Sequence, residues 1–185
     1  MAQFQDFENE YGPPENCETP SAETLSKYEG VLPAELLEKW RETGLCSYGK
    51  GLLWLVDPAQ FADVIDDWVE VSDSEPVVFL RTAFAHLYFW QKGAVFSLDV
   101  HHGSLSEVTK RIERIFTLVC DPEIKEKMVR ASLFEQALPK LGPPGRDECY
   151  GFEPAIALGG PGTVDTLRRV KIREHLGILA QIHKG

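Results

Sequence analysis

Asp99, His101 and Glu107 come closest, by residue type and spacing, to an acid–base site in this chain. Asp99 and His101 are two positions apart on an expected strand, so they share one strand face and could form an acid–base pair. No motif for an activated nucleophile accompanies them. A small hydrolase that uses these three residues is therefore only a minor alternative, and the sequence predicts a protein that is not an enzyme and has no catalytic residues.

Two further motifs resemble sites for a metal or a cofactor. His101 and His102 are adjacent at a strand end, so they point to opposite faces and cannot easily chelate one ion, and no HExxH spacing follows. Gly159-Gly160-Pro161-Gly162 lacks the Lys-Ser/Thr of a phosphate-binding loop and the spacing of a dinucleotide fingerprint. We therefore predict structural or surface histidines, a glycine-dependent turn, no metal and no cofactor.

The distribution of charge points to binding. Residues 1–80 carry a net charge of −13 and residues 81–185 a net charge of +3. Between Lys50 and Arg81 no basic residue occurs, but seven acids do: Asp57, Asp63, Asp66, Asp67, Glu70, Asp73 and Glu75. An acidic half of this kind repels itself when compact, which favours a positively charged partner. It argues against direct binding to nucleic acid or to an anionic membrane.

The helix expected after Asp57 would organise these acids. Asp57-Pro58 supplies an N-cap and a first-turn proline. Apolar residues then recur at the i, i+3, i+4, i+7 spacing of an inward face, namely Phe61, Val64, Ile65 and Trp68. Asp63, Asp66, Asp67 and Glu70 have the same spacing on nearly the opposite face, and we call them the acidic stripe.

The acidic stripe has two interpretations. Like charges at this spacing destabilise a helix by about 0.2–0.5 kcal/mol per pair, and no Lys or Arg interleaves to offset that cost. The stripe is either a solvated face or a docking surface for a basic partner, which would speed encounter and weaken with salt. In the second interpretation Trp68, Asp73 and Glu75 extend the partner-binding surface. A short basic run, Arg168, Arg169, Lys171 and Arg173, is expected on the last helix, either paired with the acidic half or solvated.

The expected elements define an α+β protein, with an antiparallel meander flanked by helices and a mostly helical C-terminal unit. We predict helices over 33–40, from Asp57 onward, over 121–138 and at the C-terminus, and strands over 51–56, 77–83, 87–90 and 94–100. Ser104-x-x-Glu107 reads as a capping box that opens another helix. The first ~23 residues are polar and turn-rich and are expected to wrap the surface. The predicted domains are residues 1–103 and 104–185.

Compartment signals favour the cytoplasm. No apolar run approaches the ~20 residues that span a bilayer, and the N-terminus lacks the features of a signal peptide. Cys17, Cys46, Cys120 and Cys149 form no CxxC pair, so free thiols in a reducing cytosol are expected.

Two longer stretches carry a family resemblance. The first resembles the GAD-like domain of bacteria, through Tyr11-Gly12-Pro13-Pro14, Lys27-Tyr28-Glu29-Gly30-Val31-Leu32-Pro33, Tyr48-Gly49-Lys50-Gly51-Leu52-Leu53-Trp54 and Arg81-Thr82-Ala83-Phe84. The second is similar to the C-terminal domain that follows a GAD-like domain in type VI secretion immunity proteins, through Asp147-Glu148-Cys149-Tyr150-Gly151-Phe152-Glu153-Pro154 and His175-Leu176-Gly177-Ile178. Together they span nearly the whole chain in the expected order.

The resemblance implies a cytoplasmic immunity protein that binds and neutralises a cognate type VI effector, often a DNase. It implies no catalytic residues and suggests a 1:1 heterodimer with the toxin. A nuclease needs a basic cleft for the phosphate backbone, so an acidic inhibitor could compete with DNA there. An effector-loading adaptor is the alternative binding function, and it differs in leaving the effector active.

Overall fold

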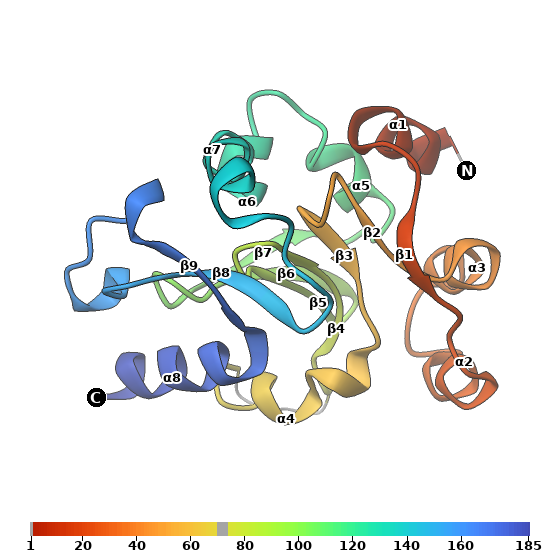
Figure 1. Cartoon of the computed structure of the whole chain (residues 1–185). Coiled ribbons are helices and arrows are strands. Elements are labelled where there is room, and N and C mark those ends of the chain that lie inside the picture. The colour runs from red at the N-terminus through yellow and green to blue at the C-terminus, as the bar shows by residue number, and fades with distance from the viewer. Residues whose placement is uncertain (1, 70–73) are drawn as a thin grey trace.

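The computed structural model describes residues 2–69 and 74–185, and its centre is an antiparallel sheet. Seven strands lie side by side in chain order (Figure 1). They are β1 (Glu15–Glu18), β2 (Leu45–Tyr48), β3 (Leu53–Leu55), β4 (Val77–Thr82), β5 (Leu87–Gln91), β6 (Ala94–Asp99) and β7 (Ser104–Thr109). The α+β class is confirmed, and so is the meander over 76–100, because its β-branched and aromatic residues favour strands.

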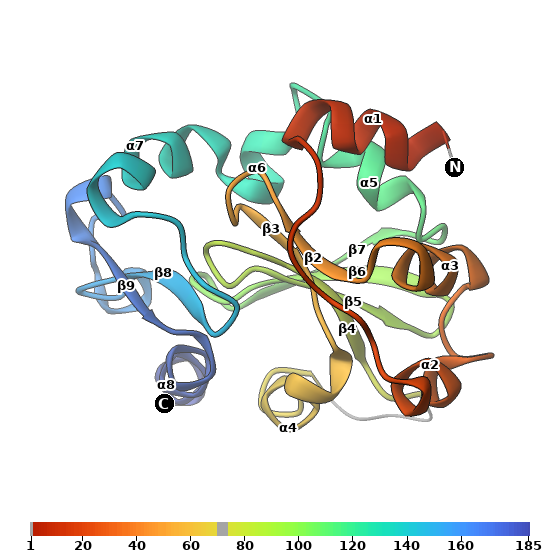
Figure 2. The ribbon, with the colours of Figure 1, turned by 45° about the vertical axis from the view of Figure 1, so that its right-hand side comes forward.

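Helices cover both faces of the sheet. Figures 1 and 2 show α1 (Ala2–Tyr11), α5 (Arg114–Leu118), α6 (Lys125–Val129) and α7 (Ala131–Leu141) on one face, with α4 (Ala62–Ile65) and α8 (Ile172–Lys184) on the other. The helices α2 (Ala22–Tyr28) and α3 (Ala34–Thr43) lie beyond β1. A hairpin of β8 (Glu148–Phe152) and β9 (Leu167–Lys171) precedes α8, and three short 3₁₀ turns complete the fold: η1 (Pro58–Gln60), η2 (Ile156–Leu158) and η3 (Val164–Thr166).

Alternation along the strands divides the core into two clusters. Phe79 and Tyr88 belong to the cluster under α1, α5 and α7, whereas Val78 and Phe89 belong to the cluster under α4 and α8. Successive side chains of a strand point to opposite faces, so a sheet covered on both sides needs apolar residues at every position. The strand burial pattern agrees, since all six residues of β4 are buried.

Several local signals act as predicted. Helix α3 begins directly after Pro33 and ends at Gly44, whose φ of 87° is accessible to glycine at little cost. A Cβ on Gly44 would also lie 2.7 Å from the Glu18 carbonyl oxygen, so glycine is needed at this crossing. The Asp57 side chain accepts a hydrogen bond from the Ala59 N–H at the start of η1, which confirms the N-cap.

The capping box is wrong, because residues 104–109 form β7. Ser104 pairs with Asp99 and Ser106 with Ser97 across an antiparallel ladder. The strand is favoured over the predicted helix because the ladder satisfies the backbone N–H and C=O groups of these residues and extends the meander by one strand. The sheet therefore runs past residue 103, and the division into units 1–103 and 104–185 stays a prediction.

Other elements depart from expectation in length or place. The N-terminus does not simply wrap the surface: it forms α1, and its Phe7 is fully buried against Tyr48 and Phe116. The helix expected over 121–138 is broken at Arg130, which adopts a left-handed conformation between α6 and α7. The helix expected after Asp57 is shorter than predicted and consists of η1 and α4.

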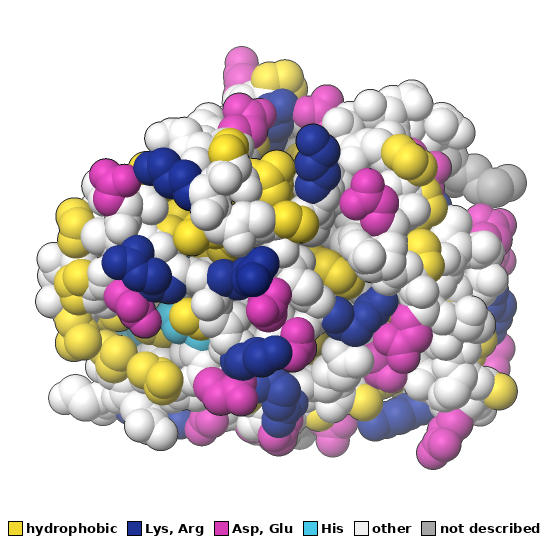
Figure 3. Space-filling view, viewed as in Figure 1, with side chains coloured by type: hydrophobic (Ala, Val, Ile, Leu, Met, Phe, Trp, Pro, Cys, Tyr) yellow, Lys and Arg dark blue, Asp and Glu magenta, His cyan; other side chains and the backbone are white. Residues whose placement is uncertain are grey.

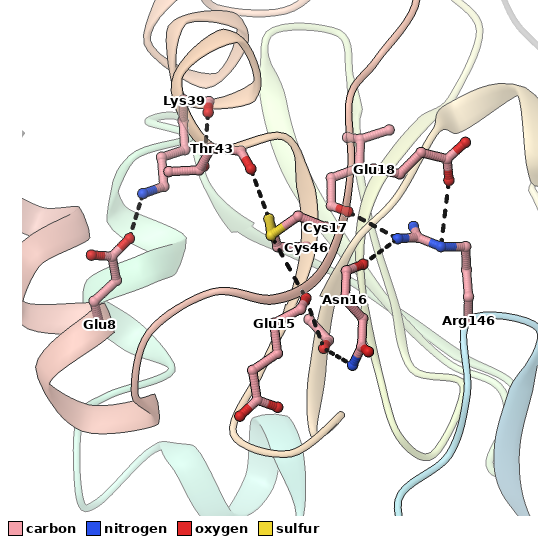
Figure 4. The surroundings of a disulfide bond; sticks show 11 residues. Glu8, Glu15, Asn16, Cys17, Glu18, Lys39, Thr43, Cys46 and Arg146 are labelled. Carbon is pink, nitrogen blue, oxygen red and sulfur yellow. Dashed lines mark hydrogen bonds and ion pairs between the residues drawn. A yellow bond between two sulfur atoms is a disulfide. The ribbon is translucent and has the colours of Figure 1, made fainter.

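The cysteine expectation is corrected in part. Cys17 of β1 and Cys46 of β2 form a disulfide, whereas Cys120 and Cys149 are free thiols (Figure 4). The sequence separation of 29 residues does not predict this disulfide, because only the pairing of β1 with β2 brings the two cysteines together. Arg146 joins the same edge by donating to the Asn16 and Leu45 carbonyls.

We expect reduction of this disulfide to lower the free energy of unfolding by about 2–4 kcal/mol, because the bridge restricts a ~30-residue loop of the unfolded chain. Urea denaturation with and without dithiothreitol measures the difference. Cys17→Ser should show the reduced stability under both conditions. An oxidised and a reduced protein with equal urea midpoints would contradict the prediction.

Candidate functional site

Two residues of the acidic stripe, Asp63 and Asp67, lie at the seam between α4 and α8. Asp63 accepts a hydrogen bond from Arg173 at 2.6 Å, and Asp67 pairs with Lys184 at 2.8 Å. The Arg173 hydrogen bond holds the pKa of Asp63 below its ordinary value. Asp66 is exposed and pairs with no described residue. Two of the stripe's carboxylates are thus matched by cations of the C-terminal helix, which sequence spacing alone could not specify.

Of the remaining predicted partner-binding residues, the structure describes Trp68 and Glu75. Trp68 is half-buried, its ring centroid 5.5 Å from that of His183, and its indole nitrogen has no hydrogen-bond acceptor in the described part of the chain. Glu75 is exposed and lines a shallow hollow with Lys27 and Tyr28. Glu70 and Asp73 lie outside the described residues.

The basic run is divided between two elements. Arg168, Arg169 and Lys171 lie on β9, contrary to the helix expected for them, and only Arg173 lies on α8. Their partners are Glu153, Glu148, Asp147 and Asp63 respectively. Figure 3 shows Lys and Arg side chains interspersed with Asp and Glu on this face. Pairing with the acidic half therefore applies to Arg173 alone.

A second acidic surface was not anticipated from the sequence. Glu35, Glu38 and Glu42 of α3 face Glu8 of α1 across an open groove of about 340 Å³. Lys39 lies in the same groove, buried and paired with Glu8 at 2.5 Å. The i, i+3, i+7 spacing on α3 was the available signal, but only the packing of α1 against α3 turns it into a groove.

Comparison with known proteins identifies both parts of the chain. Residues 2–103 match the GAD-like domain, and residues 110–183 match the C-terminal domain of the T6SS immunity protein Tdi1. The chain belongs to the GAD-like domain family. The second match supports an immunity function in type VI secretion, which is a binding function.

A solved structure shares the fold. The crystal structure of Atu4351 from Agrobacterium tumefaciens superposes with a TM-score of 0.79 at 20% sequence identity, covering 96% of this chain and 88% of that one. At this identity the likeness shows the fold alone. A search of curated proteins finds no significant match. Across the described ranges, no helix is both long and apolar enough to cross a membrane.

The GAD-like part and the Tdi1-type part meet at a buried arginine. The Arg81 side chain of β4 is fully buried and donates 2.9 Å hydrogen bonds to the carbonyls of Gly145 and Arg146. Its guanidinium lies 4.9 Å from the centroid of the Trp54 ring, a cation–π distance. Burial lowers the pKa of Arg81 to about 10, so the side chain remains charged at neutral pH.

A second contact between the two parts is made by histidines. The His101 and His175 ring centroids are 5.7 Å apart, and a Cβ on Gly151 would lie 2.6 Å from the His175 ring. His101 is buried, with its Nε2 2.9 Å from the Phe84 carbonyl. Burial lowers the pKa of His101 to about 3 and that of His175 to about 4. Both rings therefore pack at the contact between the two parts.

We expect these two histidines to make the protein acid-sensitive. The unfolded chain protonates them below about pH 6.5, whereas the folded state resists protonation until about pH 4, so stability is complete above pH 6.5 and falls with pH. The free energy of unfolding should be about 4 kcal/mol lower at pH 5 than at pH 7.5.

Urea titrations at both pH values measure this loss. His175→Gln should reduce the difference by about half, whereas the exposed His102→Gln should leave most of it. A pH-independent urea midpoint, or an unchanged pH dependence in His175→Gln, would contradict the assignment.

Asp99 does not pair with His101 as an acid–base couple. Its carboxylate lies 3.4 Å from His86 Nε2, 2.8 Å from His102 Nδ1 and 3.4 Å from Arg130 Nη2. Although burial opposes it, the hydrogen bonds from His86 and His102 and the nearby Arg130 charge hold the pKa of Asp99 well below its usual range. Glu107 pairs across the ladder with Phe96. Among described residues, no group of three or more His, Cys, Asp or Glu could hold a metal ion.

Proposed function

We propose that this GAD-like protein neutralises a cognate type VI nuclease toxin by forming a tight 1:1 complex through its acidic surface. The observation that carries the proposal is the match of residues 110–183 to the C-terminal domain of the T6SS immunity protein Tdi1, directly after a GAD-like domain. The net charge of −10, concentrated in residues 1–80, supports the basic character of the partner.

The acidic stripe is the proposed contact surface, together with Trp68, Asp73 and Glu75. Its pairs with Arg173 and Lys184 do not prevent docking, because the acids of both pairs are more than half exposed. Exposed pairs of this kind contribute only about 0.2–1 kcal/mol. Arginines or lysines of a toxin could therefore replace these partners at small cost, while the free Asp66 carboxylate is available from the start.

Charge alone does not account for protection inside a cell. Nanomolar affinity corresponds to about 12 kcal/mol, and most of that energy comes from buried anchors, with charge contributing rate and specificity. Trp68 is the proposed anchor, because its ring lies between α4 and α8 beside the stripe and its buried indole N–H lacks an acceptor within the described part of the protein.

Co-expression with the product of an adjacent toxin gene tests the function. We expect a 1:1 complex on size-exclusion chromatography with light scattering, and loss of DNA cleavage by the toxin when this chain is present. A complex in which the toxin still cleaves DNA would favour an effector-loading adaptor. Failure of the pair to co-purify would contradict the proposal.

A further inference from the structure

A polar patch interrupts the helix-covered face of the sheet. Tyr88, Ser97 and Ser106 are cross-strand neighbours on β5, β6 and β7, and Asp99 pairs with Ser104 one step along. Cross-strand partners share a face, and this face carries the apolar cluster under α1, α5 and α7 elsewhere, including Val95 of the same strand. Ser97 and Asp99 are half-buried and Ser104 and Ser106 are exposed on the edge strand β7, so these polar side chains line an open hollow between the sheet and the helices that cover it.

A cavity of about 320 Å³ lies over this patch. Its floor is the polar face of β5, β6 and β7, and its apolar walls come from α5, α6 and the segment before α6, through Leu118, Ile124 and Met128. Figure 2 shows α5 and α6 on this side of the sheet. This volume lies at the lower end of the range of small-molecule sites, and a mixture of apolar walls with a few convergent polar groups is typical of them.

Several polar atoms in the cavity lack protein partners. His86 is 6% exposed, and its Nδ1 is buried without a hydrogen-bond partner among the described residues. The hydroxyls of the half-buried Ser97 and of the exposed Ser104 and Ser106 line the same cavity, and they make no hydrogen bond to the described part of the chain. A buried imidazole nitrogen without a partner lowers stability, and a bound ligand would supply the missing hydrogen bond.

The charges that line the cavity are balanced. Asp99 is surrounded by His86, His102 and Arg130, so its negative charge is already compensated. The other charged residues of the cavity, Glu107 and Lys127, have opposite signs. A cavity without excess charge does not select an ion, whereas serine and histidine groups suit a ligand that both donates and accepts hydrogen bonds. The Tyr88 hydroxyl is already used, since it donates to the Met128 carbonyl at 2.8 Å.

We propose that this cavity binds a small, uncharged polyhydroxyl ligand of monosaccharide size. A ligand hydroxyl can donate a hydrogen bond to His86 Nδ1 when this nitrogen is unprotonated, or accept one when it is protonated. The nitrogen therefore gains a hydrogen bond in either protonation state. The serine hydroxyls of β6 and β7 would form hydrogen bonds to other hydroxyl groups of the ligand. Ile124 and Met128 would pack against its C–H face. This site is independent of toxin binding.

The position of the cavity predicts an effect on stability. His86, Tyr88 and Ser97 lie within the GAD-like match, whereas Leu118, Ile124 and Met128 lie within the Tdi1-type match. A ligand that binds only when the two parts are packed together stabilises the folded state by mass action. For a dissociation constant of about 2 mM, 20 mM ligand raises the melting temperature by about 3–5 °C.

The test uses D-glucose, D-galactose, D-ribose and myo-inositol at 20 mM with the full chain, read by thermal shift and by saturation-transfer-difference NMR. We expect at least one of the four to give both signals. Ser106→Leu, which fills the cavity mouth, should abolish both signals. Ser26→Leu, the same change at an exposed position of α2, should leave them intact.

Two results would overturn the proposal. One is the absence of both signals for all four compounds with the wild-type chain. The other is binding that persists unchanged in Ser106→Leu. Glucose 6-phosphate serves as a charge control, and tighter binding of this anion than of glucose would also refute an uncharged ligand class.

Discussion

Reversal of Asp63, Asp66 and Asp67 to lysine is expected to slow association with the cognate toxin by about 100-fold at low salt and to abolish protection of the producing cell. Electrostatic steering raises association rates by about 10–1,000-fold, and the effect depends on where the charge lies relative to the contact. Each reversal also removes a carboxylate with which toxin cations would pair. Stopped-flow mixing or surface plasmon resonance measures the rate, and co-expression with the toxin measures protection.

A matched variant separates the acidic stripe from the general charge of the protein. Glu35, Glu38 and Glu42 to lysine changes the net charge by the same amount in the groove between α1 and α3. We expect less than about a tenfold effect on the association rate for this variant. Equal slowing by the two variants would assign the effect to the overall field, and an unchanged rate in the stripe variant would show that the stripe is only a solvated face.

The stripe variant should remain folded, since the pairs of Asp63 with Arg173 and of Asp67 with Lys184 are exposed. Losing both pairs costs about 1–2 kcal/mol at most. A thermal unfolding curve for each variant provides this control. In wild type, raising the salt concentration should slow association in the same direction as the stripe reversal, because ions screen the same charges.

Arg81→Ala is expected to lower the free energy of unfolding by about 3–5 kcal/mol, with a fall in melting temperature of roughly 10 °C. The substitution leaves the Gly145 and Arg146 carbonyls without their donor and opens a cavity beside Trp54. Calorimetry or urea denaturation measures the loss. Arg41→Ala, which removes an exposed arginine 3.9 Å from Glu29, should change stability by less than about 0.5 kcal/mol.

Two further substitutions show why Arg81 matters. Arg81→Met fills most of the volume that Arg81→Ala leaves empty, but the Gly145 and Arg146 carbonyls still lack a hydrogen-bond donor. We therefore expect it to recover only part of the stability that Arg81→Ala loses. Arg81→Lys retains the charge but lacks the planar fork that reaches both carbonyls, so we also expect it to be destabilised. A fully stable Arg81→Met protein would show that the guanidinium hydrogen bonds contribute nothing net.

Local patterns determined much of the secondary structure. The proline before α3, the cap at Asp57 and the β-rich run over 76–100 acted as expected, because each depends on backbone geometry within a few residues. The inward face of Phe61, Val64, Ile65 and Trp68 was also correct, since all four pack in the cluster under α4 and α8. The charge asymmetry indicated binding to a basic partner, and the family motifs indicated the immunity function, both without any coordinates.

Tertiary contacts decided the rest. Residues 104–109 carry a capping signal, yet pairing with β6 makes them a strand, because ladder hydrogen bonds outweigh one local cap. Cys17 is joined to Cys46, and Asp63 to Arg173 of α8, across long separations in the sequence. His86 Nδ1 is left without a hydrogen-bond partner among the described residues. The chain thus determined by itself most of its helices and strands and the charge that it presents. Only the packing of distant elements decided which acids are paired, which cysteines are joined and where a cavity opens, because these depend on distances that local spacing does not encode.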